Sequence, residues 1–354
     1  GTDTAGSGRV PAALNNIVGL KPTLGALSAT GVVPACRTLD TVSIFALSVD
    51  DAYAVFAAAR AFDAADAYAR RFPAAPLGPA PQALKIGVPS KESIRFFGDA
   101  SQEAAFDAAK SMIEGQGGAI VELDFGPLYA IAQMLYDGAW VAERYTVVED
   151  LLKQDSDALH PVTRAVIARA EGFSAADAFR DMYRLADLRR KAEPLLASVD
   201  MLCVPTIPTF VSLDDLEADP IGPNSRLGTY TNFVNLMDLC AIAVPTGLRG
   251  DGRPASVTLI AGAGEDARIA AFAARLHGAA GGTMGATAWP VPTPTERATA
   301  VAPGEIALLV AGAHMSGLPL NGELTRLGAR FLRAARTAGN YRLYALAGGP
   351  PFRP

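Results

Sequence analysis

Residues 1–9 read GTDTAGSGR and are followed at once by an apolar stretch, VPAALNNIVGL, over residues 10–20. Six of the first nine residues are glycine, threonine or serine. A polar backbone with small side chains therefore lies directly beside a segment of core. Small residues such as Ala5 and Gly6 let a backbone approach another group closely, and the successive N–H groups around them are able to converge on one carbonyl oxygen.

Ser7 lies beside these N–H groups, and this placement is typical of a nucleophilic serine. Such a serine needs a base, an anion-stabilising pocket and a backbone tight enough to present its hydroxyl. Two other interpretations stay open at this point. The stretch also fits a Gly-Ser loop that caps a helix beginning near Pro11. A phosphate-binding loop is the third, although the lysine of GxxxxGK[ST] and the spacing of GxGxxG are both absent.

Residues 1 to about 57 resemble the core of the amidase signature family. Its members carry a GTDTGGS[IV]R-x-PA stretch, followed by GLKPT and by LDT; here these are GTDTAGSGR-VPA, GLKPT at 19–23 and LDT at 39–41. VPT at 204–206 and VPTG at 244–247 match later strands of the family.

The resemblance implies that Ser7 is the acyl-enzyme nucleophile and that the backbone N–H groups of Thr4, Ala5, Gly6 and Ser7 form the oxyanion hole. Ala5 replaces the usual glycine, and Gly8 replaces an isoleucine or valine. Neither change touches the hydroxyl.

The family also uses a lysine as base and a serine of a cis Ser-Ser pair as proton relay, both N-terminal to the nucleophile. The sequence has no Ser-Ser dipeptide, and all of its lysines follow Ser7. We therefore expect the segment with the base and relay to lie outside residues 1–354. Lys21, in GLKPT, is interpreted as a packing or strand-end lysine.

LYDGAWVAERY, at 135–145, resembles a segment of one branch of this family, the allophanate hydrolases. The resemblance implies that Tyr136 and Arg144 hold a small anionic substrate. A guanidinium binds a carboxylate through two parallel hydrogen bonds, so the residue type suits the task. From the residues alone, a surface arginine and a half-buried core tyrosine are the simpler interpretations.

Residues 308–346 resemble the opening of the C-terminal domain of allophanate hydrolases, which has a γ-glutamylcyclotransferase-like fold. The resemblance implies a role for His314 in decarboxylating the product of the amidase reaction. An imidazole near pH 7 is able to hold a carboxylate or to transfer a proton. A strand-end histidine bonded to the backbone is the alternative.

The composition excludes several classes of protein. The net charge is −5 without a basic cluster, and only 7% of residues are aromatic, which argues against binding of nucleic acid. The three cysteines are widely spaced, which favours a reducing, cytoplasmic setting over a disulfide framework or zinc ribbon, and no apolar run is long enough to span a membrane. His160 and His277 have no ligand spacing around them, so no metal is expected.

Strand and helix patterns predict an α/β fold, an α/β/α sandwich on a mixed sheet, over residues 1–280. Residues 44–72 show helical spacing, with Asp50 and Asp51 near the expected start of a helix. Residues 281–303 are rich in glycine, proline and threonine and are interpreted as a linker. Residues 304–354 are expected to start a small, truncated α+β domain, with a strand near 305–310 and a helix and strand after it.

The resemblance implies an amidohydrolase that acts on allophanate, releases ammonia and N-carboxycarbamate, and needs no cofactor. It further implies a homodimer and a functional link to a biotin-dependent urea carboxylase. Another small-amide amidase is the alternative among enzymes. A non-catalytic binding module on the same scaffold is the alternative from a different class, and the intact Ser7 loop argues against it.

Overall fold

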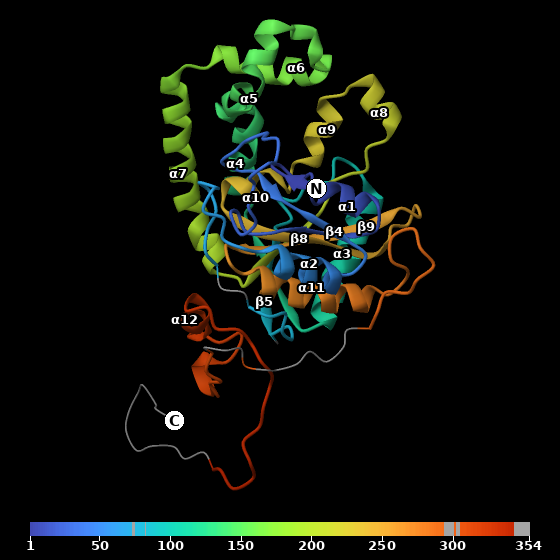
Figure 1. Cartoon of the computed structure of the whole chain (residues 1–354). Coiled ribbons are helices and arrows are strands. Elements are labelled where there is room, and N and C mark those ends of the chain that lie inside the picture. The colour runs from blue at the N-terminus through green and yellow to red at the C-terminus, as the bar shows by residue number, and fades with distance from the viewer. Residues whose placement is uncertain (73–74, 82, 294–300, 302–304, 343–354) are drawn as a thin grey trace.

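A mixed sheet of seven strands forms the centre of the protein (Figure 1). The computed structural model describes residues 1–72, 75–81, 83–293, 301 and 305–342. From one edge of the sheet to the other, the strands are β4 (Ile44–Ala46), β2 (Val18–Lys21), β8 (Leu239–Leu248), β9 (Pro254–Gly262), β7 (Met201–Pro205), β5 (Leu84–Pro89) and β6 (Gly118–Leu123).

Three of these strands run parallel and the others pair antiparallel with their neighbours. β5 lies between β6 and β7 and is parallel to both. Its connection to β6 runs through helix α3 (Ala100–Gly115), as parallel neighbours require a crossover. β7 and β8 are continuous apolar runs whose residues are buried except at the end of β8, as expected for strands covered on both faces.

Helices cover both faces of the sheet, which confirms the predicted α/β/α sandwich on a mixed sheet (Figure 1). One core lies between the sheet and α2 (Val49–Ala59), α3 and α11 (Asp266–Ala280). The second core lies on the opposite face, under α4 (Gly126–Asp137), α7 (Ala175–Ala197) and α10 (Asn232–Leu236).

The described residues contain six further helices. They are α1 (Val10–Leu14), α5 (Trp140–Gln154), α6 (Pro161–Ala168), α8 (Leu213–Ala218), α9 (Gly222–Leu227) and α12 (Asn321–Arg326), together with 3₁₀ turns at Ser156–Ala158, Arg169–Gly172 and Gly312–His314. A separate two-stranded ladder pairs β1 (Thr2–Asp3) with β3 (Thr41–Val42).

The helix predicted within residues 44–72 starts near Asp50 and Asp51 as expected, but it ends at Ala59. β4 pairs with β2 first, and Ser48 then caps α2 by accepting from the backbone N–H of Asp51. After Ala59 the chain is irregular. Asp63 and Asp66 each accept from the backbone N–H two residues ahead, and these local bonds compete with the helical ladder.

The described part of the C-terminal segment, residues 305–342, contains no strand, so the prediction of a strand at 305–310 is wrong. A strand needs a neighbour for its hydrogen bonds, and no described residue offers one. Ile306 and Leu309 are 91% and 69% exposed as a result. The helix expected from residue 324 is limited to α12. The strand expected after this helix is not present up to residue 342, and the residues that follow lie outside the described part of the chain.

Candidate active site

Residues 3–9, which contain the predicted nucleophile Ser7 and are called the nucleophile loop below, connect β1 to α1. Ser7 is exposed, and its Oγ donates a hydrogen bond to the carbonyl oxygen of Thr2 at 2.8 Å. The residues on both sides, Gly6 and Gly8, are buried. The chain therefore presents one hydroxyl to solvent from an otherwise enclosed turn.

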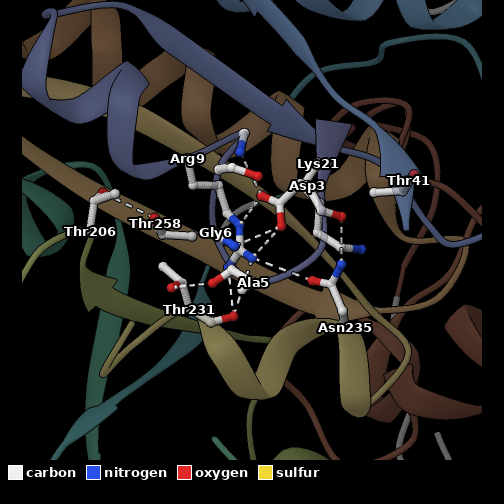
Figure 2. Close-up of polar contacts among 12 residues, drawn as sticks. Asp3, Ala5, Gly6, Arg9, Lys21, Thr41, Thr206, Thr231, Asn235 and Thr258 are labelled. Atoms are coloured by element: carbon white, nitrogen blue, oxygen red, sulfur yellow. Dashed lines mark hydrogen bonds and ion pairs between the residues drawn. The ribbon is translucent and has the colours of Figure 1, made fainter. Parts of the chain in front are cut away.

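A fully buried ion pair between Asp3 and Arg9 holds this loop together (Figure 2). Arg9 donates from Nε and Nη2 to the two carboxylate oxygens at 2.9 and 3.0 Å. The same oxygens accept from the backbone N–H groups of Gly6 and Gly8. Burial alone would raise the pKa of Asp3, but Arg9 and these bonds outweigh it and lower the pKa below its ordinary value.

Glycine is required at two positions of the loop. Gly6 has φ +135°, a conformation that side chains rarely adopt, and a Cβ there would collide with the side chain of Thr231. A Cβ on Gly8 would lie 2.5 Å from the Cβ of Ser43. The glycine that replaces the usual isoleucine or valine at position 8 therefore fits the close approach of Ser43.

The carbonyl oxygens of Asp3, Ala5 and Gly6 accept hydrogen bonds, whereas the N–H groups of Thr4, Ala5 and Ser7 are open. Asn235 Nδ2 donates to Asp3 O at 2.8 Å and Thr231 Oγ1 donates to Ala5 O at 2.7 Å. Gly6 O accepts from two N–H groups of the following helix. Among the described residues, no acceptor bonds to the backbone N–H groups of Thr4, Ala5 and Ser7.

Gly6 departs from the predicted oxyanion hole. Its N–H donates to Asp3 Oδ1 at 2.9 Å, so this group is already engaged inside the loop. The prediction that all four N–H groups face a substrate oxygen therefore does not hold for Gly6. Its contribution is the left-handed turn that separates the open N–H groups of Ala5 and Ser7.

Lys21 is not placed as a base for Ser7. It ends β2, is fully buried, and donates from Nζ to the carbonyl oxygens of Pro22 and Leu239 at 2.9 and 2.7 Å. Burial lowers its pKa to about 8, against the opposing effect of the Asp3 carboxylate. These contacts agree with the interpretation of Lys21 as a packing lysine.

Tyr136 and Arg144 come from two consecutive helices, α4 and α5, and lie together. The guanidinium carbon of Arg144 is 4.4 Å from the centre of the Tyr136 ring. Nε and Nη2 of Arg144 are enclosed, and no described residue accepts a hydrogen bond from them. A buried guanidinium with unpaired donors is costly unless an anion completes it.

Residues 35–40 connect Arg144's helix to the nucleophile loop. Thr38 donates from its N–H and its hydroxyl to the carboxylate of Glu143, at 2.7 Å each. Asp40 accepts from the N–H of Cys36 and from the hydroxyl of Thr4. The Cys36 thiol lies near Arg144, and burial raises its pKa to about 12 although the guanidinium opposes this.

The histidines fall in three different settings. His314 lies in the C-terminal segment, where its Nε2 is 3.4 Å from the carboxylate of Glu323 and its carbonyl oxygen accepts from Asn321. His160 caps α6, and His277 is buried in the last turn of α11. Burial lowers the pKa of His277 to about 4. The described residues include no group of three side chains arranged to hold a metal ion.

The structure thus brings together two of the predicted groups and leaves the third apart. The Ser7 loop and the Tyr136–Arg144 pair are joined through residues 35–40, whereas His314 is bonded within the C-terminal segment. Sequence reasoning missed Thr231, Asn235 and Asp40, which brace the loop. LDT contains Asp40, so the family motif pointed to it, but TNFVN, at 231–235, has no pattern that singles it out.

Comparison of the chain with known protein families shows to which family it belongs. A family model described as "Amidase" matches residues 1–270. The chain belongs to the amidase family. A second family model, "Allophanate hydrolase C-terminal domain", matches residues 306–354.

Individual relatives extend the comparison. The urea amidolyase of Lachancea kluyveri is 40% identical over the whole chain, which covers 20% of that protein. The solved structure of Kluyveromyces lactis allophanate hydrolase superposes with a TM-score of 0.82 at 40% identity, over 99% of this chain and 59% of that one. The 2-amino-5-chloromuconic acid deaminase of Comamonas testosteroni is 30% identical over 77% of this chain and 58% of that protein.

The chain spans only part of these relatives, from about a fifth of the urea amidolyase to somewhat more than half of the allophanate hydrolase. Within the described residues, none of the helices combines the length and the apolar character that crossing a membrane requires.

Proposed function

We propose that this chain is the amidase part of an allophanate hydrolase. The observation that carries the proposal is an exposed Ser7 hydroxyl flanked by open backbone N–H groups, in a chain whose C-terminal residues match a domain of allophanate hydrolases. Residues 1–280 would form the amidase domain, 281–303 the linker and 304–354 the start of the C-terminal domain.

In the proposed reaction, Ser7 Oγ attacks the carbonyl carbon of the terminal amide of allophanate. The oxygen of the tetrahedral intermediate accepts hydrogen bonds from the N–H groups of Ala5 and Ser7, with Thr4 beside them. The C–N bond then breaks, ammonia leaves with a proton, and an acyl ester remains on Ser7. Water hydrolyses the ester and releases N-carboxycarbamate, which then decarboxylates.

The proton of Ser7 needs an acceptor other than the Thr2 carbonyl. The Nζ of Lys21 already donates hydrogen bonds to two carbonyl oxygens, so it does not accept this proton. The family resemblance assigns the task to a lysine and a relay serine N-terminal to the nucleophile, and we propose that this pair acts here. The scheme requires neither a metal nor an organic cofactor.

Arg144 and Tyr136 support allophanate over a neutral amide. Allophanate carries a carboxylate, and Arg144 has two enclosed N–H donors without an acceptor among the described residues. The ring of Tyr136 lies against the guanidinium, an arrangement that favours its positive charge at this place. The substrate carboxylate would then accept hydrogen bonds from these two enclosed donors.

Arg144→Ala tests the substrate assignment. We expect KM for allophanate to rise by roughly 30-fold, about 2 kcal/mol of lost charge-assisted bonding, in steady-state assays of the intact protein. Hydrolysis of a small neutral amide should change little. Arg180→Ala, an exposed arginine of α7 paired with Asp177, is the control and should affect neither substrate. Equal losses on both substrates would favour another small-amide amidase.

His314 is proposed to act in the second step, the loss of carbon dioxide. The nearby carboxylate of Glu323 is suited to hold its imidazole in a fixed orientation. In His314→Ala, ammonia from the first step should appear at the normal rate while carbon dioxide is released more slowly. Unchanged release of both products would make His314 a structural residue.

We further propose that the protein acts as a homodimer in the cytoplasm and is linked functionally to a biotin-dependent urea carboxylase. The name of its relatives, urea amidolyase, and the match to the allophanate hydrolase domain support the link to the carboxylase, while the homodimer and the cytoplasmic setting rest on the family resemblance. Light scattering on the purified protein measures its oligomeric state, and a monomer at assay concentration would contradict the proposed homodimer.

A further inference from the structure

Two side chains of one short segment hold the backbone of the nucleophile loop from below (Figure 2). Thr231 precedes α10, and Asn235 lies one turn later within it. Both are buried, and both donate to carbonyl oxygens of the loop: Thr231 Oγ1 to Ala5 O, and Asn235 Nδ2 to Asp3 O. They lie more than 220 residues from the loop in sequence.

These bonds fix the direction of peptide planes. In a trans peptide, the C=O of one residue and the N–H of the next point in opposite directions. Asn235, by holding the Asp3 carbonyl, turns the N–H of Thr4 away from α10. The N–H groups of Arg9 and Val10 donate to Gly6 O and fix the next peptide plane in the same way. The N–H of Ser7 therefore points away from these two donors.

The peptide between Ala5 and Gly6 is the one most free to rotate. Gly6 has no Cβ and a positive φ, so a flip of this plane meets little steric resistance. A flip would turn the Ala5 carbonyl oxygen toward the side of the open N–H groups, where it would repel a developing oxyanion. Two bonds oppose the flip: Gly6 N–H to Asp3 Oδ1 at 2.9 Å, and Thr231 Oγ1 to Ala5 O at 2.7 Å.

Thr231 is itself anchored to the buried ion pair. Its carbonyl oxygen accepts from Nη1 and Nη2 of Arg9, at 3.2 Å each, and Arg9 Nη2 also contacts Asn235 Oδ1 at 3.4 Å. The brace and the loop therefore share one rigid group, the Arg9 guanidinium. Motion of α10 relative to the loop would break bonds on both sides of it.

We infer that Thr231 and Asn235 are positioning residues that hold the open N–H groups of the nucleophile loop toward the substrate. Neither touches the reacting atoms. The inference rests on the proposed function, because it assigns these N–H groups to the oxyanion. It adds a segment, 231–235, that no motif of the nucleophile region contains.

Thr231→Val tests the inference, because valine keeps the shape of threonine and removes the hydroxyl. With the intact protein, we expect kcat for allophanate to fall 10- to 100-fold while KM stays within about twofold, since removal of one oxyanion donor itself costs about 10²- to 10³-fold. Thr231→Ser, which keeps the hydroxyl, should restore kcat to within about threefold of the native value.

The matched control is Thr258→Val. Thr258 is also buried and its hydroxyl bonds to Thr206 at 3.0 Å, in a group of hydroxyls that does not contact the loop. This variant should keep native kcat. If Thr231→Val does not fold, Asn235→Asp replaces it: the change is nearly isosteric, removes the donor to Asp3 O, and should lower kcat with KM unchanged.

The outcomes distinguish a failure of the proposed function from a failure of the positioning role of Thr231 and Asn235. A native protein that includes the lysine and relay serine N-terminal to the nucleophile, yet has no activity on allophanate, would contradict the proposed function itself. With an active native protein, unchanged kcat in Thr231→Val or in the substituted Asn235→Asp would overturn the positioning role. A rise confined to KM, or a Thr231→Ser variant as slow as Thr231→Val, would overturn it as well.

Discussion

At the residue scale, Asp3 and Arg9 decide the shape of the nucleophile loop. Both side chains are fully buried, which is unfavourable for charges unless each is paired and bonded. Here the carboxylate has four donors, two from Arg9 and two from backbone N–H groups, and the guanidinium also reaches Thr231. The pair therefore links β1, the loop and α10 in a single arrangement.

Arg9→Met should show how much depends on this pair. The substitution leaves the Asp3 carboxylate buried without its partner, which typically costs about 3–5 kcal/mol of unfolding free energy. Urea denaturation followed by circular dichroism measures the loss. Arg190→Met, at an exposed surface pair on α7, is the control and should change stability by about 0.5 kcal/mol or less. An Arg9→Met protein as stable as the control would contradict the assigned role.

Much of the site was predictable from sequence because it is contiguous. Ser7, Thr4 and Ala5 lie in one stretch whose small residues and hydroxyls already indicate a nucleophile loop. The partners that orient its peptides are over 200 residues away, and their bonds depend on where β8 places α10. Nothing in TNFVN distinguishes a segment that donates hydrogen bonds to the nucleophile loop from an ordinary helical turn.

At the element scale, the buried strands were predictable and the ends of some elements were not. β5, β7, β8 and β9 are apolar runs of five to ten residues, and the structure contains each of them. Residues 44–72 read as one helix because alanines continue past Ala59, but Asp63 and Asp66 bond locally and stop it. Residues 305–310 have strand composition, yet a strand also needs a partner.

His277 makes the packing of α11 sensitive to pH. Its pKa is about 4 in the folded protein, because burial disfavours the charged ring, against about 6.5 when unfolded. The unfolded chain therefore binds a proton first, and stability falls as pH drops from 6.5 toward 4. Linkage gives a loss of about 2 kcal/mol at pH 5 relative to pH 7.5.

Comparison with His277→Leu isolates this contribution. The variant has no ring to protonate, so its unfolding free energy should fall by about 2 kcal/mol less than that of the native protein between pH 7.5 and pH 5. Urea midpoints at the two pH values measure the difference. Parallel pH dependence of the two proteins would mean that His277 is protonated in the fold without cost.

At the scale of the whole molecule, the site is assembled from three parts of the amidase domain. In the proposed function the loop at residues 3–9 would supply the nucleophile, α4 and α5 the aromatic ring and the guanidinium, and the segment 231–235 the side chains that hold the loop. Residues 35–40 tie the first two together through Asp40 and Thr38. The second core, between the sheet and α4, α7 and α10, keeps the second and third parts in register.

The measurement that tests this account most directly is ammonia release from allophanate, compared between the intact native protein and its Ser7→Ala variant. Ser7→Ala removes the only atom that forms the acyl bond, so release should fall by at least about 10⁴-fold, while Ser111→Ala, an exposed serine of α3, should match the native rate. Ammonia release by Ser7→Ala at the native rate would contradict the account.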